Sequence, residues 1–413
     1  MSNTITEDYI ANYAEAKASS LAQLVFDTLK NEARFEHVVV IPCFDESPAF
    51  AERLHRSALW SESTLVVVVI NQTLGSPLSQ KNHVLWQYFI NQPNTRELDD
   101  SLILSRCTPL SAEQTPTASA FLAVDCFRPG KQLPTKQGVG IARKLGCDMA
   151  LCLQAQGLIV DDWIYSTDAD THLPNAYFSK PTDDSIAMVF DHQHIQVQND
   201  VEKDSIFLAT QLYEQAINYY TAGLVWAKSP YAFPTLGSCL AVRADAYAHS
   251  RGFPKRAAAE DFYLLNKLAK IGIVSWRKDI TIRIEARLSG RNPFGTGPAV
   301  TSIIDKQQSI DDYCYYAPES FFELKALLET VIHQLANTNV LRLTGKMASA
   351  LADLKIDTFI DHLEKQHLTG RLAVKAWHDW FDAFKTLKFI RYLQQHHYPS
   401  LPLQQCLKQA PFA

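Results

Sequence analysis

Two short apolar segments constrain the fold of this chain more than any other feature. Residues 37–44 read HVVVIPCF and residues 64–71 read TLVVVVIN, and both are continuously apolar and rich in β-branched side chains. Strands with one solvated face alternate apolar and polar residues, whereas strands of a parallel sheet that is covered on both faces are apolar throughout. Residues 48–59 have the apolar spacing of a helix, so the three segments predict a right-handed βαβ unit.

The remaining pattern predicts an α/β domain that follows an N-terminal helix. Residues 5–30 carry apolar residues at helical spacing, which predicts a brace formed by residues 1–36. Polar sequence with Pro and Ser over residues 72–120 predicts an insertion with one or two helices. After it we expect a strand at 120–127, a helix at 138–156, a strand at 162–170, a helix at 205–226, a strand and helix at 235–247, and a helix at 258–272.

The last part of the chain has a different character. From residue 318 onward glycines are few, and apolar residues recur at helical spacing in LKALLETVIHQLA, MASALADL and WHDWFDAFKTLKFIRYL. We therefore expect an all-helical unit over residues 318–413. Residues 37–317 are expected to form a catalytic α/β domain with a mixed, mostly parallel sheet flanked by helices.

Composition disfavours several functional classes. A formal net charge of −5 provides no basic field for extended nucleic-acid binding. Eight cysteines without a CxxC pair predict free thiols in a reducing compartment. The chain starts with polar, acidic sequence, and no stretch approaches the roughly 20 apolar residues that span a bilayer. We expect a cytoplasmic enzyme without a nucleic-acid partner or a transmembrane segment, while peripheral membrane contact and a homodimer stay open.

The segment STDADTHLP places two carboxylates, Asp168 and Asp170, at the end of a predicted strand. Positions i and i+2 of an extended backbone face the same side, so both side chains are expected to converge on one ion. Oxygen ligands suit Mg²⁺ or Mn²⁺, which keep coordination positions for nucleotide phosphates. By itself such a pair is more often a solvated acidic turn, and the nearby His172 is more often a packing residue than a third ligand.

The context of this pair points to a known family. Five segments matter, namely VVIPCFDES, GVGIARKLGCDMA, STDADTHLP, GSCLAVRADAYAHSRGF and AEDFYLLNKLAKIG. In this order they resemble the opening strand, Gly-x-Gly helix, metal-binding strand end, acceptor-side segment and Glu-Asp pair of the family-2 glycosyltransferases. The resemblance covers residues 37–290 apart from the insertion. It implies a GT-A fold and an enzyme that transfers a hexose from a UDP- or GDP-linked nucleotide-sugar donor.

The resemblance also implies roles for the matching residues. Asp168 and Asp170 are implied to bind Mn²⁺ or Mg²⁺, and Asp261 is implied to be the general base of an inverting transfer, with support from Glu260. The implied donor-binding residues are Pro42, Phe44, Glu46, Asn71, Gly138, Arg143 and Asp168. The residues expected to contact the acceptor or the diphosphate are Gly237, Ser238, Arg287 and Arg291.

Two positions depart from the family pattern, and several alternatives stay open. Asn71 stands where the family usually has an Asp that reads the base, and Lys144 replaces an Asn. The fold also supports a retaining transfer. A sugar nucleotidyltransferase normally has a Gly-rich basic loop after the first strand, which PCFDESPAF lacks, and a non-catalytic sugar-nucleotide-binding subunit would not need a base. The helices after residue 318 leave the hydroxyl acceptor unidentified, and we expect them to serve the acceptor side or dimerisation.

Overall fold

The computed structural model describes residues 2–32, 34–106, 119–196, 201–288, 295–338 and 340–413. The chain forms two compact units, which we call the sheet unit and the helical unit. The sheet unit comprises residues 1–197, 235–285 and 290–295, and the helical unit comprises residues 198–234, 286–289 and 296–413. These bounds differ from the predicted ones, because the N-terminal helices pack within the sheet unit and two helices before residue 318 belong to the helical unit.

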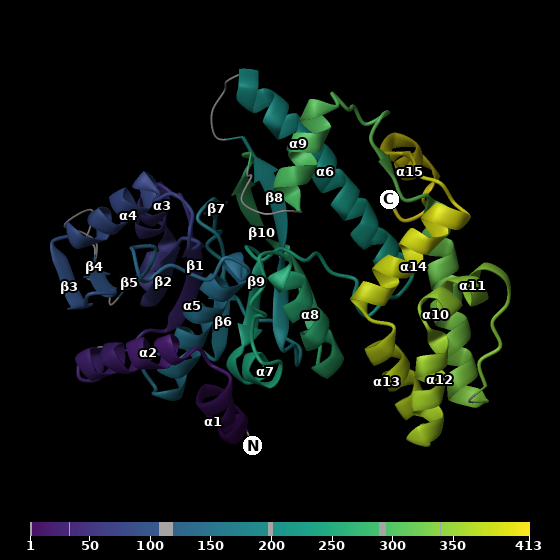
Figure 1. Ribbon diagram of the computed structural model, residues 1–413, viewed down its shortest axis with the longest axis horizontal. Coiled ribbons are helices and arrows are strands. Elements are labelled where there is room, and N and C mark those ends of the chain that lie inside the picture. The colour runs from purple at the N-terminus through teal and green to yellow at the C-terminus, as the bar shows by residue number, and fades with distance from the viewer. Residues whose placement is uncertain (1, 33, 107–118, 197–200, 289–294, 339) are drawn as a thin grey trace. The chain divides into compact units, whose positions relative to one another are not determined.

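The sheet unit is built on a ten-stranded sheet with the order β3-β4-β5-β2-β1-β6-β9-β8-β10-β7 (Figure 1). Seven strands run in one direction, namely β3, β5, β2, β1, β6, β8 and β10, and β4, β9 and β7 run against them. The strands are β1 (His37–Cys43), β2 (Thr64–Asn71), β3 (Asn94–Asp99), β4 (Leu102–Arg106), β5 (Ala120–Cys126), β6 (Trp163–Ser166), β7 (Thr171–His172), β8 (Ala187–Ile195), β9 (Leu240–Arg243) and β10 (Val274–Glu285). The predicted mixed, mostly parallel sheet is therefore confirmed.

The central strands are buried on both faces, as their continuous apolar sequences predict. Every residue of β1 and β5 is buried, and β2 is buried except at its last residue. Val40 faces helix α5, where a Cβ on Gly146 would lie 2.4 Å from Val40 Cγ1. Val39 and Ile41 point to the other face and join the core beneath α3 and α4.

In the described part of the chain, seven α-helices and one 3₁₀ helix belong to the sheet unit, and two of them precede its first strand. They are α1 (Ser2–Asn12), α2 (Ala16–Leu29), α3 (Ala49–His55), the short 3₁₀ helix η1 (Ala58–Glu62), α4 (Gln80–Ile90), α5 (Gly138–Ala155), α7 (Ala244–His249) and α8 (Glu260–Ile271). The expected single helix over residues 5–30 is two helices, and α2 packs on α5. The insertion holds α4 and the strands β3 and β4, which add an antiparallel edge to the sheet, and its residues 107–118 lie outside the described part.

The helical unit is formed mostly by helices, as its sequence predicts. Its elements are α6 (Val201–Trp226), α9 (Thr296–Asp305), β11 (Cys314–Tyr315), α10 (Pro318–Asn337), α11 (Gly345–Asp353), α12 (Ile356–Lys365), α13 (Gly370–Trp380), α14 (Ala383–His396), β12 (Leu401–Pro402) and α15 (Leu403–Gln409). The only strands described in it form a two-residue ladder between β11 and β12. Its core includes Phe321, Trp377 and Phe389, none of which is exposed.

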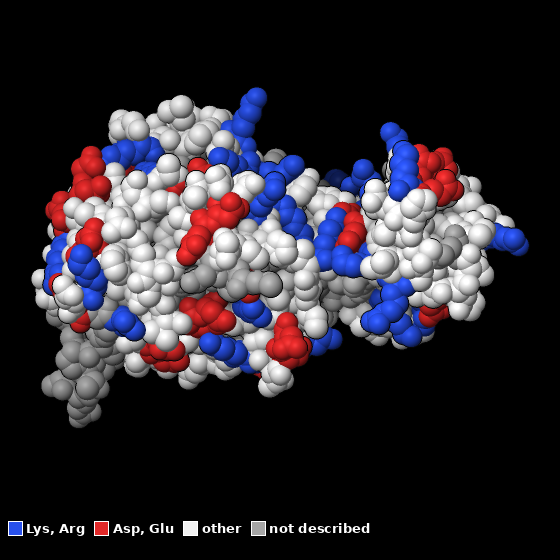
Figure 2. Space-filling view, turned by 90° about the horizontal axis from the view of Figure 1, so that it is seen from below, with Lys and Arg blue, Asp and Glu red and all other residues white. Residues whose placement is uncertain are grey.

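On the face drawn in Figure 2, basic and acidic residues are interspersed. Among the described helices, none combines the length and apolar character that a bilayer crossing requires. Six described cysteines are buried free thiols and Cys314 is exposed, while Cys107 lies outside the described residues.

Candidate active site

Several of the predicted site residues lie at the carboxyl edge of the central sheet. Asp168 follows the carboxyl end of β6, next to the parallel strand β1. Strand β9 runs antiparallel to β6 with Leu240 opposite Ser166, so Gly237 at its entrance reaches the same edge. In α/β sheets this carboxyl edge is where ligands bind.

Arg143 of α5 is the centre of this cluster. Its side chain is only 3% exposed. Its Nε donates to Glu260 Oε1 (3.1 Å) and one terminal nitrogen donates to Asp168 Oδ1 (3.0 Å). The other terminal nitrogen donates to Ser166 Oγ (2.8 Å) and to the carbonyl oxygen of Gly237 (3.0 Å). The guanidinium therefore joins the segment after β6, the entrance of β9 and the start of α8.

The charge on Arg143 is maintained by its neighbours. Burial opposes a positive charge, but the carboxylates of Asp168, Glu260 and Asp261 outweigh burial and raise the pKa of Arg143 above its ordinary value. A buried ion pair of this kind stays favourable only when its hydrogen bonds are satisfied, and Arg143 has four protein partners. Its predicted part in donor binding stays a prediction.

Gly237 permits this close packing. Its carbonyl oxygen accepts from Arg143 and from Ser166 Oγ (3.2 Å), and its backbone also hydrogen-bonds the carboxylate of Asp261. A Cβ at this position would lie 2.7 Å from a terminal nitrogen of Arg143. The adjacent Ser238 is buried, and its carbonyl oxygen accepts from Thr167 Oγ1 (2.9 Å).

Glu260 and Asp261 occupy the first turn of α8, where the helix dipole favours acidic residues. Ala259 before them has a left-handed backbone with φ of 59°, a conformation that non-glycine residues rarely adopt and that is frequent at functional sites. Glu260 is buried against Arg143, while Asp261 is partly exposed. Burial, and after it the charge of Glu260, raises the pKa of Asp261 to about 7.

Asp168 and Asp170 lie in a turn after β6, not in an extended strand as predicted. The strand ends at Ser166, and Thr171 Oγ1 donates to the carbonyl oxygen of Asp168 (2.8 Å). Asp168 and Asp170 are both partly exposed, while Ala169 between them is buried. Two accessible carboxylates fit Mg²⁺ or Mn²⁺, which use one or two carboxylates together with phosphate oxygens.

His172, which the sequence favours as a packing residue over a third metal ligand, lies beside Glu285. Its Nε2 lies 3.0 Å from Glu285 Oε1. Burial and then the positive charge of Arg53 lower its pKa, although Glu285 acts in the opposite direction. No role was predicted for Arg53 or Glu285 from the sequence, because each lies more than 100 residues from the chain segment that it contacts.

Four of the predicted donor-binding residues lie at or just after the ends of β1 and β2. Pro42 is buried in β1, Phe44 is partly exposed and Glu46 is buried. Asn71 at the end of β2 donates from its Nδ2 to the carbonyl oxygen of Cys43 (3.0 Å), which ties the two strand ends together. Asp45 has a left-handed backbone with φ of 58°.

The glycines of the Gly-x-Gly helix bring α5 close to the segment before α8. A Cβ on Gly138 would lie 2.6 Å from Ala257 Cα, and a Cβ on Gly140 would lie 2.5 Å from the carbonyl oxygen of Arg256. The amide of Gly140 donates to that same carbonyl (3.0 Å). This approach brings Arg143 within reach of Glu260.

Two further predicted site residues, Arg287 and Arg291, follow β10 in the sequence. Arg287 belongs to the helical unit, and Arg291 lies outside the described residues. Their expected contacts with the acceptor or the diphosphate stay predictions.

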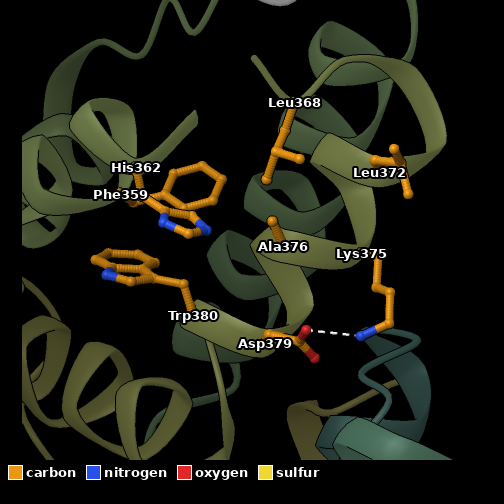
Figure 3. Close-up of a pocket in the computed structure, with 8 residues that line it drawn as sticks. All are labelled: Phe359, His362, Leu368, Leu372, Lys375, Ala376, Asp379 and Trp380. Carbon is orange, nitrogen blue, oxygen red and sulfur yellow. Dashed lines mark hydrogen bonds and ion pairs between the residues drawn. The ribbon is translucent and has the colours of Figure 1, made fainter. Parts of the chain in front are cut away.

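The helical unit contains a pocket of its own, with a volume of about 410 Å³. It is lined by Phe359, His362, Leu368, Leu372, Lys375, Ala376, Asp379 and Trp380 (Figure 3). Lys375 Nζ pairs with Asp379 Oδ2 at 2.7 Å, so its two charged residues neutralise each other. The carboxylate cluster around Arg143 is therefore the stronger candidate for an active site.

Comparisons with known proteins gave matches only among solved structures. No family model and no curated protein matches the sequence. TarS of S. aureus in complex with UDP-GlcNAc is 11% identical, with 74% of this chain and 68% of that chain covered and a TM-score of 0.34. The mannosyltransferase PcManGT from Pyrobaculum calidifontis in complex with GDP-Man and Mn²⁺ is 13% identical, with coverages of 96% and 100% and a TM-score of 0.36. GalNAc-T7 with UDP, GalNAc and Mn²⁺ is 12% identical, with coverages of 89% and 59% and a TM-score of 0.37.

Proposed function

We propose that this chain is a GT-A-type glycosyltransferase that moves a hexose from a UDP- or GDP-linked donor to a hydroxyl group, with inversion at the anomeric carbon. One observation carries the proposal. A single buried guanidinium, that of Arg143, hydrogen-bonds Asp168 on the metal side and Glu260 beside Asp261 on the base side. Such a transfer requires a charge-neutralising group at the leaving diphosphate and a base at the acceptor, in a fixed relative position.

Asp168 and Asp170 would hold a divalent cation, Mn²⁺ or Mg²⁺, and a bound cation neutralises the charge that develops on the diphosphate. Arg143 holds one oxygen of Asp168 and so fixes the orientation of that carboxylate. Phe44, Glu46 and Asn71, at the ends of β1 and β2, contact the nucleotide in this proposal.

Asp261 is the general base. The acceptor oxygen attacks the anomeric carbon, the bond between that carbon and the diphosphate oxygen breaks, and the hydroxyl proton moves to the carboxylate of Asp261. A base is most effective when its pKa lies near the working pH, and the pKa of Asp261 is about 7. A retaining enzyme or a sugar nucleotidyltransferase would not need this base. The helical unit serves the acceptor side in this proposal.

The proposal is tested by a thermal-shift screen of UDP- and GDP-linked sugars with and without Mn²⁺. A ligand at 100 times its Kd adds about 2.7 kcal/mol to the free energy of unfolding. We expect one donor to raise the Tm only with Mn²⁺, and Asp168→Ala and Asp170→Ala to abolish that effect. Asp162→Ala is the matched control, because this carboxylate near β6 is 64% exposed. Metal-dependent donor binding with wild-type affinity in either variant of the pair would refute the metal assignment.

A further inference from the structure

Arg53 of α3 lies outside every sequence motif, yet its guanidinium contacts the turn that carries Asp168 and Asp170. One terminal nitrogen donates to the carbonyl oxygens of Ala169 (2.8 Å) and Thr171 (3.0 Å). Its Nε also donates to the carbonyl oxygen of Thr171 (3.2 Å). The side chain thus binds the backbone on both sides of Asp170.

Glu285, the last residue of β10, holds the same turn from another direction. Its backbone amide donates to the carbonyl oxygen of Asp170 (2.9 Å). Its carboxylate pairs with the remaining terminal nitrogen of Arg53 (3.2 Å) and with His172 Nε2 (3.0 Å). Three consecutive carbonyl oxygens, those of residues 169, 170 and 171, therefore accept hydrogen bonds from two residues that also bind each other.

A short turn between two strands has several accessible backbone conformations, and each one directs the carboxylates differently. When all three carbonyl groups are anchored, the direction of the Cβ atoms of Asp168 and Asp170 is set before any ligand arrives. Residues that hold metal ligands in this way strongly affect metal affinity without touching the metal.

We propose that Arg53 and Glu285 are positioning residues, which form a clamp that holds the turn of Asp168 and Asp170 in the conformation that binds a divalent cation. This inference rests on the proposed function, because it takes the two carboxylates as the metal ligands. Arg53 lies in α3, the first helix after the proposed nucleotide-binding loop, so the clamp also connects that loop to the metal side of the site.

The direction in which loss of the Arg53 guanidinium changes cation affinity distinguishes a clamp from a purely electrostatic influence. A positive guanidinium near the carboxylate pair repels a cation, so its removal would tighten cation binding if charge were its only influence. A clamp predicts the opposite, because the loosened turn must be ordered again when the cation binds.

The first measurement is Mn²⁺ affinity, read from the electron paramagnetic resonance signal of free Mn²⁺ with the full chain. We expect Arg53→Met to weaken Mn²⁺ binding by roughly 10- to 100-fold, the range for residues that support metal ligands. Arg53→Lys, which retains the charge but not the forked geometry, is expected to fall between Arg53→Met and the wild type. Arg56→Met is the control, because Arg56 is an exposed residue at the end of the same helix.

The second measurement is amide hydrogen exchange without metal. The amide of Glu285 should exchange faster in Arg53→Met, while amides of β1 and the overall Tm change little. Unchanged exchange at this amide, or Mn²⁺ binding that is unchanged or tighter, would overturn the clamp. If wild-type protein binds no Mn²⁺, or if Asp170→Ala binds it normally, the metal assignment of the proposed function is wrong. Hydrogen exchange is measured without metal, so it tests the clamp separately from the metal assignment.

Discussion

Asp261 follows Glu260 at the start of α8, and the charge of Glu260 adds to burial in raising the pKa of Asp261 to about 7. In the unfolded chain an Asp has a pKa near 3.9, so the folded state holds this proton more tightly. Stability from that proton is fully present below the unfolded pKa and is lost as pH rises through about 7.

Replacement of Asp261 by Asn should therefore stabilise the protein relative to wild type at alkaline pH. Asn does not titrate, whereas burial of a charged Asp261 is unfavourable. We therefore expect the Tm of Asp261→Asn minus the Tm of wild type to be larger at pH 8.5 than at pH 5. Thermal unfolding at both pH values measures this gain, and the exposed Asp162→Asn should show none. A Tm difference that does not depend on pH would contradict the raised pKa.

Removal of the central guanidinium should be strongly destabilising. Arg143→Leu leaves the buried carboxylate of Glu260 without its cation, and loss of one partner of a buried pair costs about 3–5 kcal/mol. Urea unfolding measures the change, and Lys136→Leu at an exposed position should shift the free energy of unfolding by less than about 0.5 kcal/mol. A loss below about 1 kcal/mol for Arg143→Leu would show that Arg143 is not the centre of the cluster.

Gly237→Ala should disturb the same cluster from the other side. The added Cβ would stand 2.7 Å from a terminal nitrogen of Arg143, so the guanidinium must move away from Asp168. We expect a loss of about 1–3 kcal/mol, as for other overpacked sites, together with weaker metal-dependent donor binding. In an Arg143→Leu background the same substitution should lower the free energy of unfolding by less, since the effects of substitutions at residues in contact are not additive. Equal costs in both backgrounds would refute the clash.

The sequence predicted those parts of the fold that depend on local pattern. Strands β1, β2 and β5 are continuous apolar runs, and α8 (Glu260–Ile271) lies within the helix expected over residues 258–272. The break between α1 and α2 and the edge strands β3 and β4 were not predicted. Strand β3 is polar and largely exposed, so no apolar alternation marks it. Strand β4 is a short apolar run inside the otherwise polar segment 72–120.

The candidate site was predictable at its motifs but not at its connections. Asp168, Gly237 and Glu260 stand in motifs, and the structure brings all three to Arg143. Arg53 is separated from Ala169 by 116 positions, and only the folded sheet brings α3 to the turn after β6. Hydrogen bonds to backbone carbonyls depend on the geometry of the acceptor and not on its side chain, so residue type gives no signal for them.

The most direct test of the account is the release of UDP or GDP from the donor found in the screen, with Mn²⁺ present and wild type compared with Asp261→Asn. Wild-type turnover should rise with pH around pH 7, as Asp261 loses its proton. Asp261→Asn should bind the donor with unchanged affinity, while turnover falls by roughly 10²- to 10⁴-fold, the range for loss of a general base. Equal turnover in the two proteins would remove Asp261 from the mechanism and contradict the account.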